Sequence, residues 1–123
     1  MGGAVKAVFD TNILIDYLNG IEAAKTELAR FSVRQISIIT FIEVMVGSQN
    51  EAEEEALQGF LSSFEVLELT AKVANEAISI RKETRLKIPD AIVYATARTQ
   101  GCILVSRNTK ELKRDWPDIR VPY

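Results

Sequence analysis

The chain has 123 residues, a length typical of one domain spanning 1–123, and 47% of them are hydrophobic. It contains no histidine and one cysteine, Cys102, which excludes Ser-His-Asp triads, histidine-bound zinc and intramolecular disulfides. The net charge of −2 indicates no general attraction to nucleic acid, although a local basic patch is compatible with it. Carboxylates, hydroxyls, amines and a hard metal ion remain as means of catalysis.

No targeting or membrane segment is expected. The first residues lead through a single Lys6 to Asp10, without the apolar core of a secretory signal. The most apolar window, 36–47, contains Glu43 and is shorter than the ~20 residues that a membrane span needs. We expect a cytoplasmic protein, in agreement with the single cysteine.

Strand and helix patterns alternate along the chain. The first half predicts a strand over 4–9, a helix from the capping cluster 10–12 to Gly20, a helix over 21–31, a strand over 35–39, a helix from Thr40 to about Gly47 and a charged helix over 51–60. The second half predicts a strand over 64–69, a helix from Thr70 to about Arg85, a helix from Pro89 to Gly101, a strand over 102–105, a helical turn over 108–114 and an edge strand over 119–121. Strands separated by helices indicate an α/β fold with a mainly parallel sheet of four to five strands and helices on both faces.

Acidic residues follow several of the predicted strands. Asp10 comes directly after the first strand, and Glu43 lies in what should be the first turn of the helix after the second. Asp90 follows Pro89 at a helix start, and the polar run 106–108 follows the last buried strand. Because parallel sheets bind ligands at the carboxyl ends of their strands, we expect these side chains to meet at one edge.

Each acid also has a purely structural interpretation. Asp10 can cap a helix, Thr40 and Glu43 match a capping box, and Asp90 suits the positive end of a helix dipole. The apolar neighbours of all three acids favour a shared site instead. Clustered, poorly solvated carboxylates repel one another unless a cation neutralises them, and an all-oxygen site suits Mg²⁺ or Mn²⁺.

Four segments, at 10–16, 39–44, 86–92 and 104–110, resemble the four successive motifs of PIN-domain ribonucleases. In particular they are similar to the VapC-like toxins of toxin–antitoxin pairs. The resemblance implies a three-layer α/β/α sandwich and an endoribonuclease that uses Mg²⁺ or Mn²⁺. Carried over by position, it makes Asp10, Glu43 and Asp90 the catalytic and metal-binding acids. It also implies an RNA substrate, a small antitoxin partner and a homodimer.

The fourth motif departs from the common family pattern. Asn108 stands where an aspartate is frequent, and Glu111 with Leu112 replaces an Asp-Phe pair. Either Glu111 or Asn108 could act as the fourth site residue, and the number of metal ions stays open. Thr11 and Ser106 are placed to hydrogen-bond a carboxylate or the scissile phosphate. Asp16 is expected to point away from the site into solvent.

Two basic runs approach the predicted acidic edge. Arg85 and Lys87 precede Asp90, while Arg107 and Lys110 follow the last buried strand, and these four are candidate RNA contacts or simply solvated charges.

Apolar residues within 21–31 and 41–45 exceed what one sheet face needs and favour a dimer.

Three other functions compete with a nuclease toxin. A phosphotransfer or nucleotide-binding domain lacks its motifs here, since Asn12 replaces a second Asp and no Gly-rich phosphate loop is present. An inactive PIN-like binding module and an RNA-processing nuclease outside a toxin–antitoxin pair both stay open.

Overall fold

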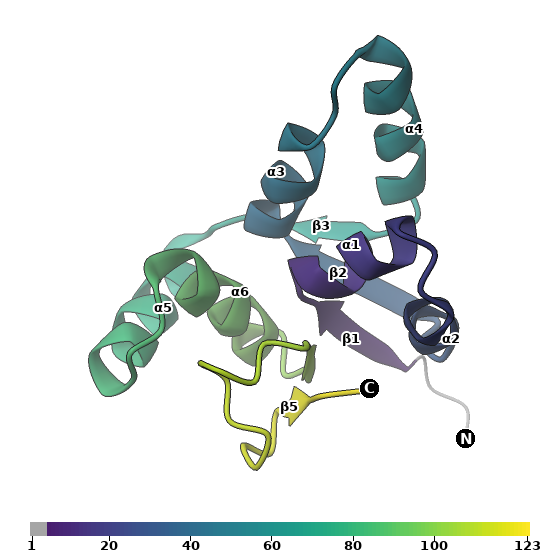
Figure 1. Ribbon diagram of the computed structural model, residues 1–123. Coiled ribbons are helices and arrows are strands. Elements are labelled where there is room, and N and C mark those ends of the chain that lie inside the picture. The colour runs from purple at the N-terminus through teal and green to yellow at the C-terminus, as the bar shows by residue number, and fades with distance from the viewer. Residues whose placement is uncertain (1–4) are drawn as a thin grey trace.

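Five parallel strands form the centre of the computed structural model, which describes residues 5–123 (Figure 1). The strands are β1 (Lys6–Phe9), β2 (Val33–Ser37), β3 (Glu65–Leu67), β4 (Leu104–Val105) and β5 (Ile119–Arg120). They lie in the order β3-β2-β1-β4-β5, and all four pairings are parallel. The predicted mainly parallel sheet is confirmed; Ala4, predicted to begin the first strand, lies outside the described residues.

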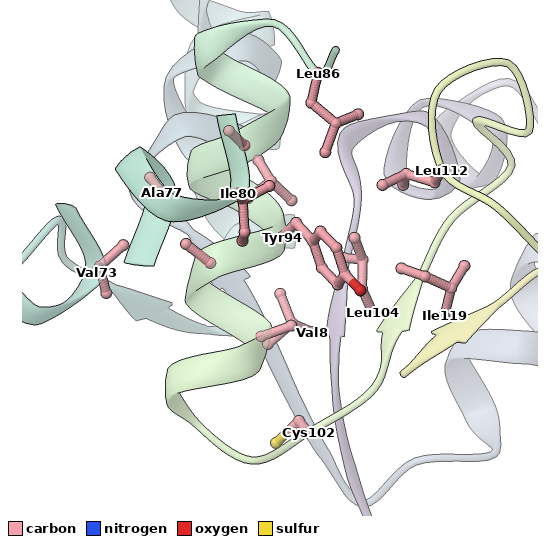
Figure 2. Close-up of a cluster of buried hydrophobic side chains, with 14 residues drawn as sticks. Val8, Val73, Ala77, Ile80, Leu86, Tyr94, Cys102, Leu104, Leu112 and Ile119 are labelled. Carbon is pink, nitrogen blue, oxygen red and sulfur yellow. The ribbon is translucent and has the colours of Figure 1, made fainter. Parts of the chain in front are cut away.

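Helices cover both faces of the sheet. On one face lie α1 (Thr11–Leu18), α2 (Glu22–Ala29), α3 (Ile38–Val46) and α4 (Glu51–Leu61), and on the other α5 (Ala71–Glu83) and α6 (Ile88–Thr99). Alternate side chains of β1 divide between the two cores, since Ala7 and Phe9 pack with α1–α4 whereas Val8 packs with α5 and α6 (Figure 2). The three-layer sandwich is confirmed, and β1 lies at its centre.

The boundary between β2 and α3 differs from the prediction. Ser37 is the N-cap of α3, and its hydroxyl accepts a hydrogen bond from the Ile39 N–H at 3.0 Å. Thr40 is therefore a buried residue inside the helix, the capping box of Thr40 with Glu43 is wrong, and Glu43 lies in the second turn rather than the first. An apolar run as short as 36–39 suits a strand and a buried helix start equally well, so its pattern does not locate the boundary.

The segment after β4 also differs from the prediction. The helical turn predicted over 108–114 is present in part: the Leu112 N–H donates to the Asn108 carbonyl at 3.2 Å, and the rest of the segment is irregular or forms turns. The strand predicted over 102–105 is limited to Leu104 and Val105. So short a helical segment is unstable alone, and the buried Leu112 anchors the turn through packing instead.

Candidate active site

An open groove of about 610 Å³ lies at the carboxyl end of β1, between α1, α3 and the start of α6. It is lined by Asp10, Thr11, Asn12, Ile15, Asp16, Ile42, Glu43, Val46, Asp90 and Asn108. The fold thus brings four acids together from three segments that are far apart in the sequence.

Asp10 is the most buried acid of the groove, with 7% of its surface exposed. It is the N-cap of α1: its carboxylate accepts hydrogen bonds from the Thr11 N–H at 2.8 Å and from the Ser106 hydroxyl at 2.7 Å. Burial raises the pKa of Asp10, and the charges of Asp90 and Glu43 raise it further, while the two hydrogen bonds oppose the rise. Its role as a cap therefore leaves this carboxylate in the lining of the groove.

Asp90 lies half-buried in the first turn of α6. Burial raises its pKa, the charges of Glu111 and Glu43 add to the rise, and Lys87 opposes it. Negative charge is thus concentrated at this edge of the sheet, and Lys87 is a nearby cation that lowers the pKa of Asp90.

Glu43 is held at the groove by Thr11. The Thr11 hydroxyl donates to Glu43 Oε1 at 2.6 Å and lies 3.0 Å from the Thr40 hydroxyl. Thr11 therefore does hydrogen-bond a carboxylate, as its position in the sequence predicts. Glu43 itself is exposed and can meet a ligand in the groove.

Ser106 joins the loop after β4 to Asp10. Its fully buried hydroxyl donates to Asp10 Oδ2 and accepts from the Asn108 N–H at 3.0 Å and from the Asn12 side-chain amide at 3.3 Å. The Asn12 carboxamide oxygen in turn accepts from the Arg107 N–H at 3.1 Å. Sequence analysis missed this role of Asn12, although a polar residue two positions after Asp10 could have suggested it.

Two residues of the fourth motif, Asn108 and Glu111, lie near the acids of the groove. Asn108 lines the groove, and its carboxamide oxygen accepts a long hydrogen bond of 3.4 Å from the Glu111 N–H. Glu111 is not among the groove residues, yet it is close enough to Asp90 for its charge to raise the pKa of Asp90. Both candidates for the fourth site residue therefore remain.

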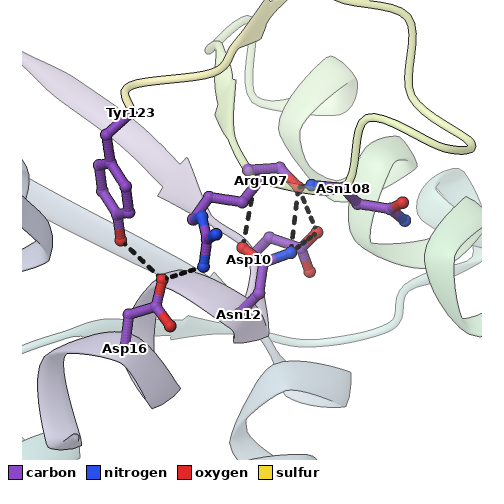
Figure 3. Close-up of polar contacts among 7 residues, drawn as sticks. Asp10, Asn12, Asp16, Arg107, Asn108 and Tyr123 are labelled. Atoms are coloured by element: carbon purple, nitrogen blue, oxygen red, sulfur yellow. Dashed lines mark hydrogen bonds and ion pairs between the residues drawn. The ribbon is translucent and has the colours of Figure 1, made fainter. Parts of the chain in front are cut away.

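Asp16 does not point into solvent, and that prediction is wrong. Its carboxylate lines the groove and accepts hydrogen bonds from Arg107 Nη1 at 2.6 Å and from the Tyr123 hydroxyl at 3.0 Å (Figure 3). Burial and the Asp16 charge raise the pKa of Tyr123 to about 12. Asp16 lies four positions after Asn12 and thus on the same face of α1, a relation that helical spacing could have shown.

The four candidate RNA contacts lie outside the groove lining. All four are exposed: Arg85, Lys87, Arg107 and Lys110. Arg107 is paired with Asp16, and Lys87 is the N-cap residue of α6.

The donor atoms of the groove suit a hard divalent cation. Asp10 and Asp90 are carboxylates whose raised pKa values reflect burial and the charges of neighbouring carboxylates, which a cation would relieve. Within residues 5–123, no group of three or more Asp, Glu or Cys side chains is arranged to hold a metal ion by itself. Water would therefore complete the coordination, as is usual for Mg²⁺, which commonly binds one or two carboxylates and keeps several waters.

Comparison with known proteins identifies the family. The sequence model of the family described as the PIN domain matches residues 7–115 of this chain. The chain belongs to the PIN domain family. Among curated relatives, the tRNA(fMet)-specific endonuclease VapC of Shigella flexneri is 32% identical, and the match covers 89% of this chain and 92% of the relative. Ribonuclease VapC1 of Methanocaldococcus jannaschii is 28% identical, with 89% of this chain and 80% of the relative covered.

Chains in solved structures have the same fold. A chain of a toxin–antitoxin complex from Klebsiella pneumoniae superposes with a TM-score of 0.89 at 39% identity, covering 95% of this chain and 98% of its own. A chain of DNA-bound VapBC from Salmonella typhimurium superposes with a TM-score of 0.75 at 27% identity. The match covers 94% of this chain and 96% of that chain. These relatives confirm the prediction of a PIN-domain ribonuclease similar to VapC toxins. Across the described part of the chain, no helix is long and apolar enough to cross a membrane.

Proposed function

We propose that this PIN-domain protein is the toxin of a toxin–antitoxin pair and cleaves RNA at the acidic groove with Mg²⁺ or Mn²⁺. The observation that carries the proposal is the meeting of Asp10, Glu43 and Asp90 around one open groove at the end of β1. The endonuclease and ribonuclease names of the relatives, and the toxin–antitoxin complexes among the similar structures, support it.

The roles of the three acids follow from their surroundings. Asp10 and Asp90 would hold the cation, because their raised pKa values mark them as the carboxylates that most need a positive partner. When bound, Mg²⁺ or Mn²⁺ supplies stabilisation of the negative charge that develops on the phosphate oxygens and eases ionisation of water. Glu43 orients the attacking water or accepts its proton, since its carboxylate is exposed and fixed by Thr11 at 2.6 Å.

Positive side chains near the groove bind the RNA backbone in this proposal. Lys87 lies close enough to Asp90 to lower the pKa of that acid, and Arg85 is two residues before it. Lys110, in the loop after β4, binds the RNA backbone in the same way. Phosphate contacts of this kind position the RNA and make its binding weaker at high salt.

A small antitoxin is the protein partner in this proposal. The groove combines acids with the exposed side chains of Ile15, Ile42 and Val46, which are 38%, 50% and 75% exposed. An arginine or lysine from the partner can pair with the carboxylates while an apolar segment covers these side chains. The partner then competes with both metal and RNA.

A homodimer also belongs to the proposal. Of the two segments that the sequence favours for it, 21–31 buries Leu28 and Phe31 in the core but leaves Ile21 43% exposed, and 41–45 leaves Ile42 50% exposed. Apolar side chains are also exposed around a hollow of about 400 Å³ between α5 and α6, where Ile78 and Ile88 are 53% and 58% exposed. Sedimentation at tens of micromolar that gives only a monomer of 13.7 kDa would refute the dimer.

The enzymatic proposal is tested by cleavage of mixed structured RNAs. Wild type should cleave in Mg²⁺ or Mn²⁺ and stop when EDTA is added, and Asp10→Asn should be inactive in all conditions. Cleavage that survives EDTA, or that Asp10→Asn retains, would refute it. An RNA-processing enzyme would cleave in the same way, so a co-encoded inhibitor protein is what separates the toxin from that alternative. An inactive binding module would bind RNA without cutting it.

A further inference from the structure

Asp16, Arg107 and Tyr123 form a cluster beside the groove (Figure 3), which we call the Arg107 cluster. Asp16 Oδ2 accepts hydrogen bonds from Arg107 Nη1 at 2.6 Å and from the Tyr123 hydroxyl at 3.0 Å. The guanidinium carbon of Arg107 lies 5.2 Å from the centre of the Tyr123 ring. Arg107 is therefore fixed by a carboxylate and by an aromatic face.

The first helix holds Arg107 at two points. Its backbone N–H donates to the Asn12 carboxamide oxygen at 3.1 Å, and its guanidinium donates to Asp16. Asn12 and Asp16 are four residues apart and lie on one face of α1, so both contacts come from a single rigid element.

The position of Arg107 affects Asp10 through the preceding residue, Ser106. Ser106 donates its hydroxyl hydrogen to Asp10 Oδ2 at 2.7 Å, and residues 106–108 belong to neither a helix nor a strand. Apart from side-chain contacts, Ser106 is fixed by one backbone hydrogen bond, from its N–H to the Arg120 carbonyl at 3.0 Å. Holding Arg107 against α1 therefore restrains the loop that carries Ser106.

The exposure of the cluster limits what it can contribute to global stability. The Arg107 side chain is 46% exposed and that of Asp16 is 16% exposed. An ion pair with one exposed partner contributes little to the free energy of unfolding. The effect of the Arg107 cluster should therefore be local, on the positions of the side chains around Asp10.

We propose that Arg107 is a positioning residue of the nuclease site, which holds Ser106 against Asp10 through its contacts with Asp16 and Asn12. The inference rests on the proposed function. It gives Arg107 a different role from the RNA contact expected from the sequence. An RNA contact would act on KM and its salt dependence, whereas a positioning residue acts on kcat and on metal affinity.

The experiment compares Arg107→Gln with Arg30→Gln, which removes an arginine of similar exposure beyond the end of α2. For each variant, kcat and KM for a defined RNA are measured at saturating Mn²⁺, and Mn²⁺ affinity is measured by calorimetry without RNA. Loss of a hydrogen-bond partner of a metal ligand typically lowers metal affinity or activity by about 10–100-fold, and Arg107 restrains such a partner, Ser106, so the lower end of that range is expected. We expect Arg107→Gln to lower both kcat and Mn²⁺ affinity about tenfold, with KM within about twofold of wild type. Arg30→Gln should match wild type.

A double-mutant cycle tests the route through Asp16. Asp16→Ala should weaken Mn²⁺ binding as Arg107→Gln does, and the double variant should lose little more, because both substitutions break the same contact. Melting temperatures should stay within about 2 °C of wild type, which separates positioning from unfolding. Unchanged Mn²⁺ affinity in Arg107→Gln, or a higher KM with unchanged kcat, would overturn the inference. If Asp10→Asn is inactive while Arg107→Gln behaves as wild type, the positioning role fails and the proposed nuclease function stands.

Discussion

Ser106 donates a 2.7 Å hydrogen bond to Asp10, although 96 positions separate the two residues in the sequence. The bond joins the ends of β1 and β4, which are paired neighbours in the sheet. It opposes the effect of burial on the pKa of Asp10 and fixes the direction of one carboxylate oxygen.

Replacing Ser106 with alanine should therefore damage the site. The buried Asp10 carboxylate would lose a donor, so we expect activity to fall about tenfold or more and the free energy of unfolding to fall by ~1–3 kcal/mol. Steady-state cleavage and urea unfolding measure the two effects. Ser106→Thr keeps the hydroxyl and serves as the control. Wild-type activity in Ser106→Ala would show that this bond has no part in the site.

Asp10→Asn should stabilise the metal-free protein at neutral pH while abolishing cleavage. Asparagine caps a helix as well as aspartate does, and it carries no charge to bury beside Asp90 and Glu43. The pKa of Asp10 is raised in the folded state, so its ionisation disfavours folding as pH rises above the ordinary value of 3.8. The stability advantage of Asp10→Asn should thus be absent below about pH 4 and grow towards pH 7. Thermal unfolding across this range in EDTA would contradict the account if the variant were less stable at pH 7.

Arg120 should be important for stability rather than for activity. It donates to both oxygens of Glu27, at 2.6 and 3.0 Å, and Glu27 is only 3% exposed. Arg120→Ala leaves a buried carboxylate without its main partner. We expect a loss of ~2–3 kcal/mol, below the usual cost of breaking a fully buried pair because the Arg120 side chain is 36% exposed. The double variant Glu27→Met/Arg120→Met should recover most of the loss in urea unfolding, and a further loss there would contradict this explanation.

Glu43→Gln should weaken inhibition as well as cleavage. If the partner places an arginine or lysine in the groove, it loses a charged acceptor in this variant. A titration of any co-encoded small protein against wild type and Glu43→Gln, with and without Mn²⁺, measures this effect. Affinity that neither the substitution nor the metal changes would locate the inhibitory contact elsewhere.

The sequence predicted the sheet and the meeting of its acids because both depend on local patterns. Adjacent residues are enough to predict where these helices begin and end, as at the caps Asp10 and Thr70 and at the terminal glycines Gly20 and Gly101. Both glycines have a positive φ, of 82° and 66°. Asp10 and Ser106 follow strands, and the rule that parallel strands align their carboxyl ends brings them together.

The errors arose where a distant residue decides the outcome. Asp16 looks solvated on its own helix because its partners, Arg107 and Tyr123, are 91 and 107 positions away. No prediction was made for Glu27, because its partner Arg120 on β5 lies 93 positions away. Ser37 rather than Thr40 caps α3, since either hydroxyl could do so and only packing of the helix selects one.

The central claim is that the groove carboxylates bind the metal used in catalysis, and calorimetric titration with Mn²⁺ tests it most directly. Four proteins are titrated at neutral pH without RNA: wild type, Asp10→Asn, Asp90→Asn and the control Glu22→Gln, which changes an exposed residue. We predict that Mn²⁺ binds wild type and Glu22→Gln with equal affinity, and that its affinity falls at least about tenfold in Asp10→Asn and Asp90→Asn. Equal Mn²⁺ affinity in all four proteins would contradict it.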